Sequence, residues 1–545
     1  MDNLVDESLV VFVCSTTGQG DPPANMKKSW RRMLQKSFPR LEDLCFSVFG
    51  LGDSSYAEFN FMAKKLHNRL LGLGAECILT RGLGDDQDDG GMDKELSVWL
   101  SKLWPALCSV MPETKKAEVV MDPPDQLLPP LCVVEVLSKP EQNGQNGQSN
   151  SHFLPAAELI HRVELCSNTR ITSAEHFQDV RHIVFKFLHA PPSYQAGDVV
   201  GIAPINTDDN VNSLLQRLNW KAEDYVQVKA VGGHTGDVPI YFNKPISIFD
   251  LCKYYLDIMG TPRRYWFELL SHFAEDEDEK ERLQYFGSAE GYLDVYSYCN
   301  KEKRSYLETL GDFPGVQIPI DRFVEVVPCI RPRLFSISSS QAVDASQLTI
   351  TVGIVEFKTP YKRERHGLCT SWLAELPAGT QLTVSLQEGG IRLPDPDVPI
   401  VMVGPGTGIA PFRAFLQERC AQENVAENVL FVGTRSKAKD YLYGPEFEQL
   451  QAQGKLSLHT AFSRDQPHKV YVQTRISEQA KKIADLIVDG NATVYIAGNA
   501  KNMPEDVQEA LRSALQAHQD MTEAEAKQYL SVMKRTQRLQ LDTWA

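Results

Sequence analysis

Residues 403–413 read VGPGTGIAPFR, a glycine-rich loop that directly follows the apolar run Ile400–Val403. Glycines let a backbone approach a pyrophosphate closely, and Pro411 is suited to the first turn of a helix, whose N-terminus attracts anions. This order of strand, loop and helix predicts a dinucleotide site. The glycines of the loop are Gly404, Gly406 and Gly408.

A second segment, FSRDQPHKVYVQ at 462–473, supplies donors that a nucleotide phosphate needs. On a strand, side chains alternate, so Lys469, Tyr471 and Gln473 would share one face. Together with Ser463 and Arg464 they suit a 2′-phosphate of about two negative charges, with adenine on the tyrosine ring. The alternative is a basic strand edge that keeps a sheet soluble. The later segments YIAGNAKNM and LDTWA favour an NADPH site that faces a flavin.

Two segments in the middle of the chain suit a flavin with a phosphate tail. Arg333, Phe335 and Ser336 lie in the expected strand RLFS, where Arg333 and Phe335 share a face that can hold a phosphate and cover a flavin. Ser336 would then reach the flavin N5. The residues Gly367–Thr370 open an expected helix, which is a second phosphate site. Taken singly, the strand could be a buried strand end and the helix start a plain cap.

Three loops in the first hundred residues follow the ends of expected strands, where open α/β sheets bind ligands. They are CSTTGQGDPP at 14–23, FGLGDSSYAEFN at 49–60 and GLGDDQDD at 82–89. The hydroxyls after Cys14 and the glycine backbone can cradle an isoalloxazine, with Tyr56 stacked on it. Acids near such a ring would make its reduction harder and form a negative docking rim, or they are simply surface-loop residues.

Composition excludes several classes of protein. The chain has 545 residues, 42% of them hydrophobic, which allows three or four domains. A formal net charge of -15 argues against nucleic-acid binding and predicts acidic faces that attract basic partners. The 11 cysteines are scattered without a C-x-x-C motif, so we expect free thiols and neither a metal site nor disulfides. No basic leader or long apolar run is present, which makes the cytoplasm the default location.

Apolar runs and turn residues predict four segments. Residues 1–111 alternate strands at 8–14, 44–50 and 75–80 with helices, which indicates a parallel sheet. Residues 112–153 are a linker and flexible insert around one strand, 131–137. Residues 154–394 form a barrel in which Gly197 and Asp198 make a turn between two strands, interrupted at about 206–325 by an all-helical insertion. In that insertion the acidic run AEDEDEKERLQYF is a solvated helix face or a docking patch. Residues 395–545 form a doubly wound domain.

In this order, the quoted segments resemble those of the diflavin reductases, the family of cytochrome P450 reductase, over residues 8–545. The resemblance implies a truncated flavodoxin-like domain, an FAD-binding β-barrel with a helical insertion, and a ferredoxin-reductase-type NADP-binding domain. In that family NADPH passes hydride to FAD, FAD passes electrons to FMN, and FMN serves a protein acceptor.

The family's site residues fall on matching positions of this chain, with Ser336, Asp542 and Trp544 as the catalytic group. For FAD these positions are Arg304, Arg333, Leu334, Phe335, Ser336, Gly367, Leu368, Cys369, Thr370 and Trp544. For NADPH they are Thr407, Ser463, Arg464, Lys469, Val470, Tyr471, Val472, Gln473 and Asp506. For FMN they are Ser15, Thr16, Thr17, Gly18, Phe49, Gly50, Leu51, Gly52, Asp53, Ser54, Ser55, Tyr56, Ala57, Glu58 and Asp86.

Two departures from the family pattern limit these expectations. Ala497 stands where the family has a cysteine beside the nicotinamide, which excludes thiol-assisted hydride transfer. The chain also begins at what resembles the third flavodoxin strand, so a central strand and its phosphate loop are missing and strand 8–14 would have an exposed edge. FMN binding is therefore in question.

Two interpretations remain open. Ala497, Asn499 and the lack of a membrane anchor favour a soluble member of the family, which implies cytosolic electron supply to anamorsin in iron–sulfur cluster assembly. The alternative is an FMN-deficient form that binds NADPH and FAD and acts as a partner-binding or regulatory protein.

Overall fold

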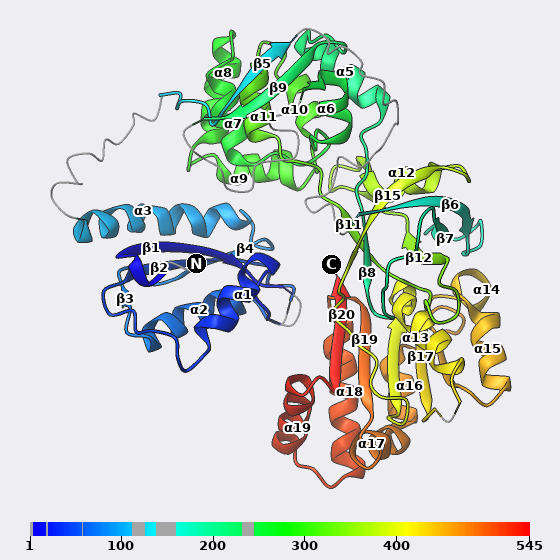
Figure 1. The fold of residues 1–545 in the computed structure, drawn as a ribbon. Helices are drawn as coiled ribbons and strands as arrows, with labels where there is room; N and C mark the ends of the chain where they lie inside the picture. The colour runs from blue at the N-terminus through cyan, green and yellow to red at the C-terminus, as the bar shows by residue number, and fades with distance from the viewer. Residues whose placement is uncertain are drawn as a thin grey trace. The chain divides into compact units, whose positions relative to one another are not determined.

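The computed structural model describes residues 4–17, 20–56, 58–111, 126–137, 160–231, 245–423 and 425–544. The chain divides into two compact units, and Figure 1 shows their helices and strands. Unit 1 consists of Met1–Leu131 and Gly260–Val326, and unit 2 consists of Cys132–Met259 and Val327–Ala545. Each unit is thus built from two separate stretches of sequence.

Unit 1 contains a parallel sheet. Its strands are β1 Leu9–Ser15, β2 Cys45–Gly52, β3 Glu76–Cys77 and β4 Gly82–Asp85. Strand β2 pairs with β1 on one side and with β3 and then β4 on the other. The expected strand at 75–80 is thus only two residues long, because the chain leaves the sheet and returns as β4. Among the described residues β1 has no second partner, and Val13 on it is 59% exposed.

Helices cover both faces of this sheet (Figure 1). Helices α1 Ala24–Met33 and α2 Phe61–Gly72 share one core with it, and a short 3-10 turn, η1 Leu4–Asp6, precedes β1. Helix α3 Met92–Val110 covers the other face, where the rings of Trp99 and Phe49 lie 5.1 Å apart. Both faces of the sheet are therefore packed against helices.

The second stretch of unit 1 is helical and packs around aromatic rings. Its helices are α7 Arg264–Ser271, α8 Glu277–Gly287, α9 Tyr292–Val295, η3 Tyr296–Asn300, α10 Tyr306–Asp312 and α11 Ile320–Val326. Trp266 is fully buried and stacks edge-on against Tyr306 and Phe323. In α8, the helix of the acidic run, only Leu283 and Phe286 are buried, so its acids lie on the outer face.

Unit 2 contains a six-stranded antiparallel sheet that is nearly closed into a barrel. Its strands, in spatial order, are β11 Arg333–Ser336, β8 Val199–Ile202, β15 Gln381–Gln387, β6 Ile160–Arg170, β7 Val180–Phe187 and β12 Gln347–Gly353. A bridge between Ile337 and Ile350 brings the two edges together. Helix α12 Leu368–Glu375 packs on the barrel core, and β13 Glu356–Lys358 pairs with β14 Glu364–His366 nearby.

The turn at Gly197 and Asp198 lies between two barrel strands, β7 and β8, as expected, and directly precedes β8. Gly197 has a positive φ of 96° and leads into β8, whereas residues 188–195 form no strand. A Cβ at Gly197 would collide with the carbonyl of Ile391, so glycine is required where these two backbones meet.

The insertion is not all-helical. Strand β9 Tyr225–Ala230 pairs with β5 Cys132–Leu137 and with β10 Ile246–Ser247 in an antiparallel sheet, beside helices α5 Asp208–Leu218 and α6 Ile248–Tyr254. The expectation failed because β9 finds its main partner in a strand about ninety residues earlier, which local periodicity does not reveal. The expected strand at 131–137 is confirmed, while most of the expected linker lies outside the described residues.

The last domain is a five-stranded parallel sheet with helices on both faces. In spatial order its strands are β18 Ser457–Phe462, β17 Asn428–Thr434, β16 Ile400–Pro405, β19 Thr493–Asn499 and β20 Leu539–Trp544. Its helices are η4 Gly406–Ile409, α13 Ala410–Cys420, α14 Lys437–Asp440, α15 Gly444–Ala452, α16 Val472–Glu478, α17 Ala480–Val488, α18 Met503–His518 and α19 Glu523–Arg535. The doubly wound fold is confirmed.

Candidate functional site

The three loops of the first domain meet at one edge of its sheet, because β1, β2 and β4 are parallel and end there. Hydrogen bonds join the loop after β2 to the loop after β4. The backbone N–H of Ser54 donates to Asp85 Oδ1 at 2.8 Å, and Gln87 Nε2 donates to Asp53 Oδ2 at 3.2 Å. The N–H of Asp86 donates to the Gly52 carbonyl at 2.9 Å. The residues expected at the FMN site therefore lie on neighbouring loops.

The first of these loops is anchored to the helix beside it. Thr16 Oγ1 accepts a hydrogen bond from the Met62 N–H at 3.1 Å, and Thr17 exchanges two backbone bonds with Asp21. Gly18 and Ala57, which were expected to contribute, lie outside the described residues. The side chain of Phe49 is fully buried against α3, so only its backbone faces the loop side.

Asn60 is a functional candidate that the sequence reasoning passed over. It is 1% exposed, adopts a left-handed φ of 52°, and donates from Nδ2 to the Gly84 carbonyl at 2.8 Å. A Cβ on Gly50 or Gly52 would collide with its amide. Its Oδ1 is buried without a hydrogen-bond partner, which leaves an acceptor available at the loop edge. An asparagine eight residues past the glycine-rich end of β2 was the available signal.

The segments expected at the FAD site form a strand and a helix start, as expected. Strand β11 carries Arg333–Ser336, with Leu334 and Arg333 exposed, and α12 begins at Leu368 with Gly367 as its N-cap. Thr370 Oγ1 accepts from the Val355 N–H at 3.1 Å. Ser371 Oγ, in the first turn of α12, is buried without a partner, so this turn has a hydroxyl available for a phosphate oxygen.

Not every residue expected at the FAD site presents its side chain there. Cys369 is 4% exposed and packs in the barrel core, and burial raises the pKa of its thiol to about 12, so it stays a neutral thiol. Arg304 belongs to unit 1, whereas the other expected FAD residues belong to unit 2. Its guanidinium pairs with Asp312 and lies 4.3 Å from the Tyr298 ring centroid.

Ser336 and Asp542 meet although 206 positions separate them. Ser336 Oγ donates to Asp542 Oδ2 at 3.0 Å, which joins the barrel strand β11 to the last strand β20. Burial raises the pKa of Asp542, and the hydrogen bond from Ser336 opposes that rise. Asp542 lies opposite Ala497 in the pairing of β20 with β19, and Trp544, 37% exposed, lies opposite Asn499. Of the three residues expected to be catalytic, Asp542 and Trp544 therefore lie on β20, and Ser336 on β11 contacts Asp542.

The glycine loop lies beside this group. It runs from β16 through η4 into α13, with Pro411 in the first turn, as expected. Gly406 has a φ of 58°, and a Cβ there would meet no atom within 4 Å, so the loop has open space for a phosphate. A Cβ on Gly408 would instead collide with the carbonyl of Ala497. The loop and the Ala497 position are therefore in contact.

The donors expected for a 2′-phosphate lie at the carboxyl ends of β17 and β18. The N–H of Ser463 donates to the Thr434 carbonyl at 2.9 Å, and that of Arg464 donates to the Arg435 carbonyl at 2.8 Å. Thr434 Oγ1 is buried without a partner. Arg435, whose guanidinium lies 4.3 Å from the Phe177 ring centroid, adds a second arginine here that the sequence reasoning missed. The signal was its place directly after a strand.

Residues 469–473 do not form a strand, which corrects the expectation that Lys469, Tyr471 and Gln473 share a strand face. Helix α16 begins at Val472, with Tyr471 as its N-cap. The expectation was wrong because the alternating Val470 and Val472 are buried at a loop-to-helix junction and not in a sheet. Gln473 Nε2 donates to Asp506 Oδ2 at 3.2 Å, so these two expected residues do meet.

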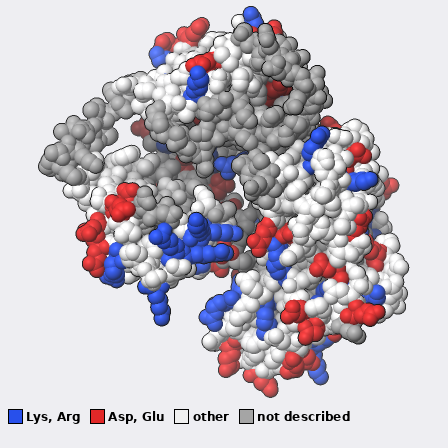
Figure 2. Space-filling view, in the orientation of Figure 1, with Lys and Arg blue, Asp and Glu red and all other residues white. Residues whose placement is uncertain are grey.

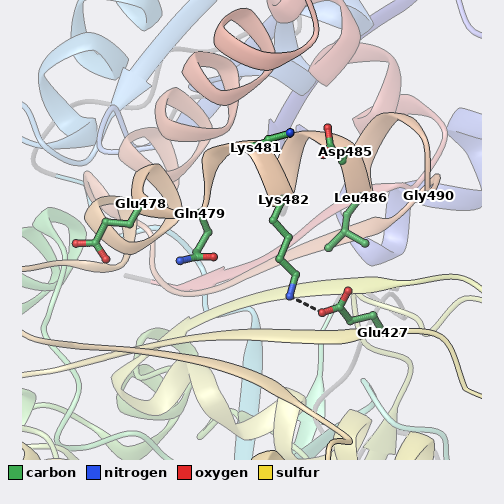
Figure 3. A pocket seen from close by; sticks show the side chains of 8 residues that line it. All are labelled: Glu427, Glu478, Gln479, Lys481, Lys482, Asp485, Leu486 and Gly490. Carbon is green, nitrogen blue, oxygen red and sulfur yellow. Dashed lines mark ion pairs between the residues drawn. The ribbon is translucent and has the colours of Figure 1, made fainter.

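A surface hollow of about 540 Å³ lies elsewhere on the same domain (Figure 3). Lys482 points towards Glu427 across it, at an Nζ to Oε1 distance of 2.5 Å. Glu427 directly precedes β17, so the hollow lies at the amino end of that strand, opposite the edge that carries Ser463 and Arg464. The hollow is separate from the expected nucleotide site.

Surface charge on this domain is mixed, and Figure 2 shows small acidic and basic groups side by side over it. The structure joins none of the 11 cysteines in a disulfide. In the ranges that the structure describes, no helix is long and apolar enough to cross a membrane.

Comparison with known proteins agrees with this arrangement. Residues 1–99 match the family of flavodoxins, residues 156–372 match an FAD binding domain, and residues 402–509 match an oxidoreductase NAD-binding domain. Proteins called NADPH-dependent diflavin oxidoreductase 1 are similar over the whole chain. The one from Danio rerio is 44% identical over 100% of this chain and 92% of its own length. Those from Bos taurus and Arabidopsis thaliana are 43% and 38% identical, over 100% and 99% of this chain and 92% of their own lengths. The chain has the flavodoxin, FAD-binding and NAD-binding domains of a flavoprotein that moves electrons from NADPH to flavin, and it belongs to the family of NADPH-dependent diflavin oxidoreductases.

Proposed function

We propose that this chain moves electrons from NADPH through FAD and then FMN to a protein acceptor, and that the contact between Ser336 and Asp542 marks where the nicotinamide meets the FAD ring. That contact joins a strand of the FAD-type barrel to the last strand of the nucleotide domain. The glycine loop reaches the same place, because Gly408 lies against Ala497, which is opposite Asp542.

The chain's own residues would bind and orient the cofactors. When bound, the nicotinamide supplies a hydride and the flavins accept its two electrons and release them singly. Arg333 and the first turn of α12, with Thr370 and the unpartnered Ser371 Oγ, would hold the FAD phosphates. Ser463, Arg464 and Lys469 would hold the NADPH 2′-phosphate, and Thr407 on the glycine loop its pyrophosphate. Trp544 would cover the FAD ring.

Ser336 and Asp542 would hold a proton between them beside the FAD ring. Ser336 Oγ donates to Asp542 Oδ2, and burial raises the pKa of Asp542, so this carboxyl keeps a proton to a higher pH than an exposed aspartate. Ala497, which lies opposite Asp542, has no thiol to take part, so the proposal rests on the hydrogen-bonded pair of Ser336 and Asp542. Their loss would slow hydride transfer without removing FAD.

In unit 1, the loops after β1, β2 and β4 would hold FMN. Asn60 Oδ1 is a buried acceptor with no partner, and the backbone of the loop at 52–56 is ordered by Asp53 and Asp85. This edge supports FMN binding over the alternative, an FMN-deficient form that only binds partners. Flavin analysis of the purified chain separates the two: equal amounts of FAD and FMN support the electron path, and FAD alone supports the alternative.

We propose a cytoplasmic acceptor, anamorsin, in iron–sulfur cluster assembly. The support is the similarity over the whole chain to proteins called NADPH-dependent diflavin oxidoreductase 1. The test mixes purified chain, NADPH and oxidised anamorsin without oxygen, and measures NADPH consumption that depends on anamorsin. A matched reaction with Asp542→Asn should be slow. If the wild-type chain reduces cytochrome c but consumes no NADPH with anamorsin, the electron path stands and this acceptor is wrong.

A further inference from the structure

One loop of unit 2 contains none of the residues expected to bind a cofactor, yet it contacts both the flavin barrel and the last strand, β20. Residues 388–393 run between the turn at Gly197 and Asp198 and the strand β20. On the barrel side, Arg392 Nη2 pairs with Asp198 Oδ1 at 2.6 Å, and the N–H of Gly389 donates to the same oxygen at 3.3 Å. The carbonyl of Ile391 lies against Gly197 so closely that no Cβ would fit.

On the other side, the backbone of Arg392 is held by β20 and β19. Its N–H donates to Gln540 Oε1 at 2.7 Å, and its carbonyl accepts from Gln540 Nε2 at 3.2 Å and from the Tyr495 hydroxyl at 2.7 Å. Gln540 is 7% exposed and Tyr495 is fully buried. Buried hydrogen bonds with every group satisfied fix geometry strongly, because any displacement leaves a polar atom unpaired.

These contacts close a ring that contains the catalytic pair. Gln540 and Asp542 are two positions apart on β20 and therefore point to the same face. Asp542 accepts a hydrogen bond from Ser336 on β11. Ser336 in turn lies opposite Val199 on β8, which directly follows Asp198 in the chain. Asp198 also accepts the Ile337 N–H at its carbonyl, 3.1 Å away. The path from Asp198 through Arg392 and Gln540 to Asp542 thus returns to the strand that carries Ser336.

We propose that Arg392 and Gln540 are positioning residues that hold the Asp542 carboxyl at Ser336, and so set the geometry in which hydride reaches the flavin. This inference rests on the proposed role of Ser336 and Asp542. Neither Arg392 nor Gln540 needs to touch a cofactor. They would act by fixing the distance between β11, which carries Ser336, and β20, which carries Asp542. Reaction rates are sensitive to displacements of about 1 Å in such a geometry.

The test uses the full chain with two variants. Gln540→Leu keeps the size and removes the three hydrogen bonds of the amide, two with the Arg392 backbone and one with the Gln537 carbonyl. Arg392→Met removes the ion pairs with Asp198 and Glu388. Arg392→Lys keeps the charge and should restore most of the activity. Gln451→Leu, at an exposed position of α15, is the matched control. FAD content, the melting temperature and the Kd for 2′,5′-ADP are measured first, and we expect retained FAD and an unchanged Kd, since the 2′-phosphate donors are on other strands.

The decisive measurement is the rate of flavin reduction by NADPH in a single turnover, with hydrogen and with deuterium at the transferred position. Gln540→Leu and Arg392→Met should slow it about ten- to a hundredfold and keep a primary isotope effect. In a double-mutant cycle, Gln540→Leu should have little further effect once Asp542→Asn is present, because it acts through that carboxyl.

The possible outcomes are distinct. Full additivity with Asp542→Asn, an unchanged rate in both variants, or a slower rate explained entirely by lost FAD would each overturn the positioning role. If Gln540→Leu does not fold, Arg392→Met and Arg392→Lys carry the same cycle. If Ser336→Ala and Asp542→Asn themselves reduce flavin normally, the proposed function of that pair fails instead.

Discussion

The side chains that would recognise the 2′-phosphate of NADPH come from two strand ends that the backbone ties together. Strand β18 is followed by Ser463 and Arg464, and β17 ends at Thr434 and is followed by Arg435. Two backbone hydrogen bonds join the two strand ends, from Ser463 to Thr434 and from Arg464 to Arg435. Arg464 is exposed, so its guanidinium is available to an anion. Arg435 and Arg464 place two positive charges at this edge of the sheet. NADPH can bind them through its 2′-phosphate, whereas NADH lacks that phosphate.

Arg464→Ala should therefore raise the KM for NADPH and leave that for NADH nearly unchanged. One charge-assisted contact is worth about 1.5 to 3 kcal/mol, which corresponds to about ten- to a hundredfold in KM. Steady-state kinetics with both nucleotides checks this, with Lys481→Ala, on an exposed position of α17, as the control for a lost charge. Equal use of both nucleotides by the unmutated chain would refute the assignment.

Trp544 is the last residue of β20, and 37% of it is exposed to solvent. Its carbonyl accepts a hydrogen bond from the Ala500 N–H at 2.8 Å. If its ring covers the flavin, it must move before nicotinamide can stack there. Trp544→Ala should change NADP⁺ affinity and the rate of flavin reduction while FAD stays bound. Stopped-flow reduction and a binding titration measure both. Unaltered values in both experiments would mean that this residue only packs the end of the chain.

At the scale of elements, the barrel and the nucleotide domain share a buried polar junction inside unit 2. The Tyr443 hydroxyl at the start of α15 lies 3.0 Å from His182 Nδ1 on β7 and 2.7 Å from Thr351 Oγ1 on β12. Arg413 of α13 pairs with Glu446 at 2.8 Å and lies 4.8 Å from the Tyr443 ring centroid. Helix α13 also follows the glycine loop, so this junction fixes that loop against the barrel.

The junction predicts a pH dependence of stability. Burial lowers the pKa of His182 from 6.5 to about 4, and the positive charge of Arg413 acts in the same direction. Between these values the unfolded chain binds a proton that the folded chain does not. The free energy of unfolding should therefore fall as the pH falls from 6.5 towards 4, by at most about 1.4 kcal/mol per pH unit and less because the ring is partly exposed.

Thermal release of FAD, followed by its fluorescence across this pH range, measures the effect. In His182→Gln the part of the slope due to His182 should disappear, and Tyr443→Phe should destabilise by about 1 to 3 kcal/mol because it leaves buried polar atoms unpaired. An identical slope in wild type and His182→Gln would show that other groups control acid sensitivity.

At the scale of the whole molecule, the proposed electron path uses both units. The loops proposed for FMN belong to unit 1, and the strands proposed for FAD and NADPH belong to unit 2, apart from Arg304. An acceptor that takes electrons from FAD should therefore report on unit 2 alone, whereas one that needs FMN should report on both units. This division allows each half to be assayed separately in the full chain.

Asn60→Ala should separate the two halves. Removing its amide takes away the bond to Gly84 and the unpartnered acceptor, which should weaken FMN binding by about 1 to 3 kcal/mol. Reduction of cytochrome c should fall with FMN content, and reduction of ferricyanide should not change. Asn491→Ala, at an exposed residue with the same left-handed φ of 52°, is the control for backbone strain. If the variant keeps FMN and full cytochrome c reduction, Asn60 has no cofactor role.

Sequence reasoning predicted most elements whose pattern is local. The strand and glycine loop from Ile400 to Gly408, the strand RLFS and the helix that follows Gly367 are all where the pattern placed them. It failed for residues 469–473, where alternating valines are buried at a helix start, and for the insertion, where β9 pairs with a distant strand. Alternation shows that side chains point to opposite sides, but it does not show what lies there.

By itself, the sequence determined the doubly wound domains, the anion-binding loops and the absence of a thiol at Ala497, because these depend on residue types and short spacings. Only the tertiary structure decided which polar groups meet. Ser336 with Asp542, Arg392 with Gln540, and Arg464 beside Arg435 are contacts between segments up to 206 positions apart. Such contacts follow from strand order and register, which the packing of whole domains fixes and no local pattern encodes.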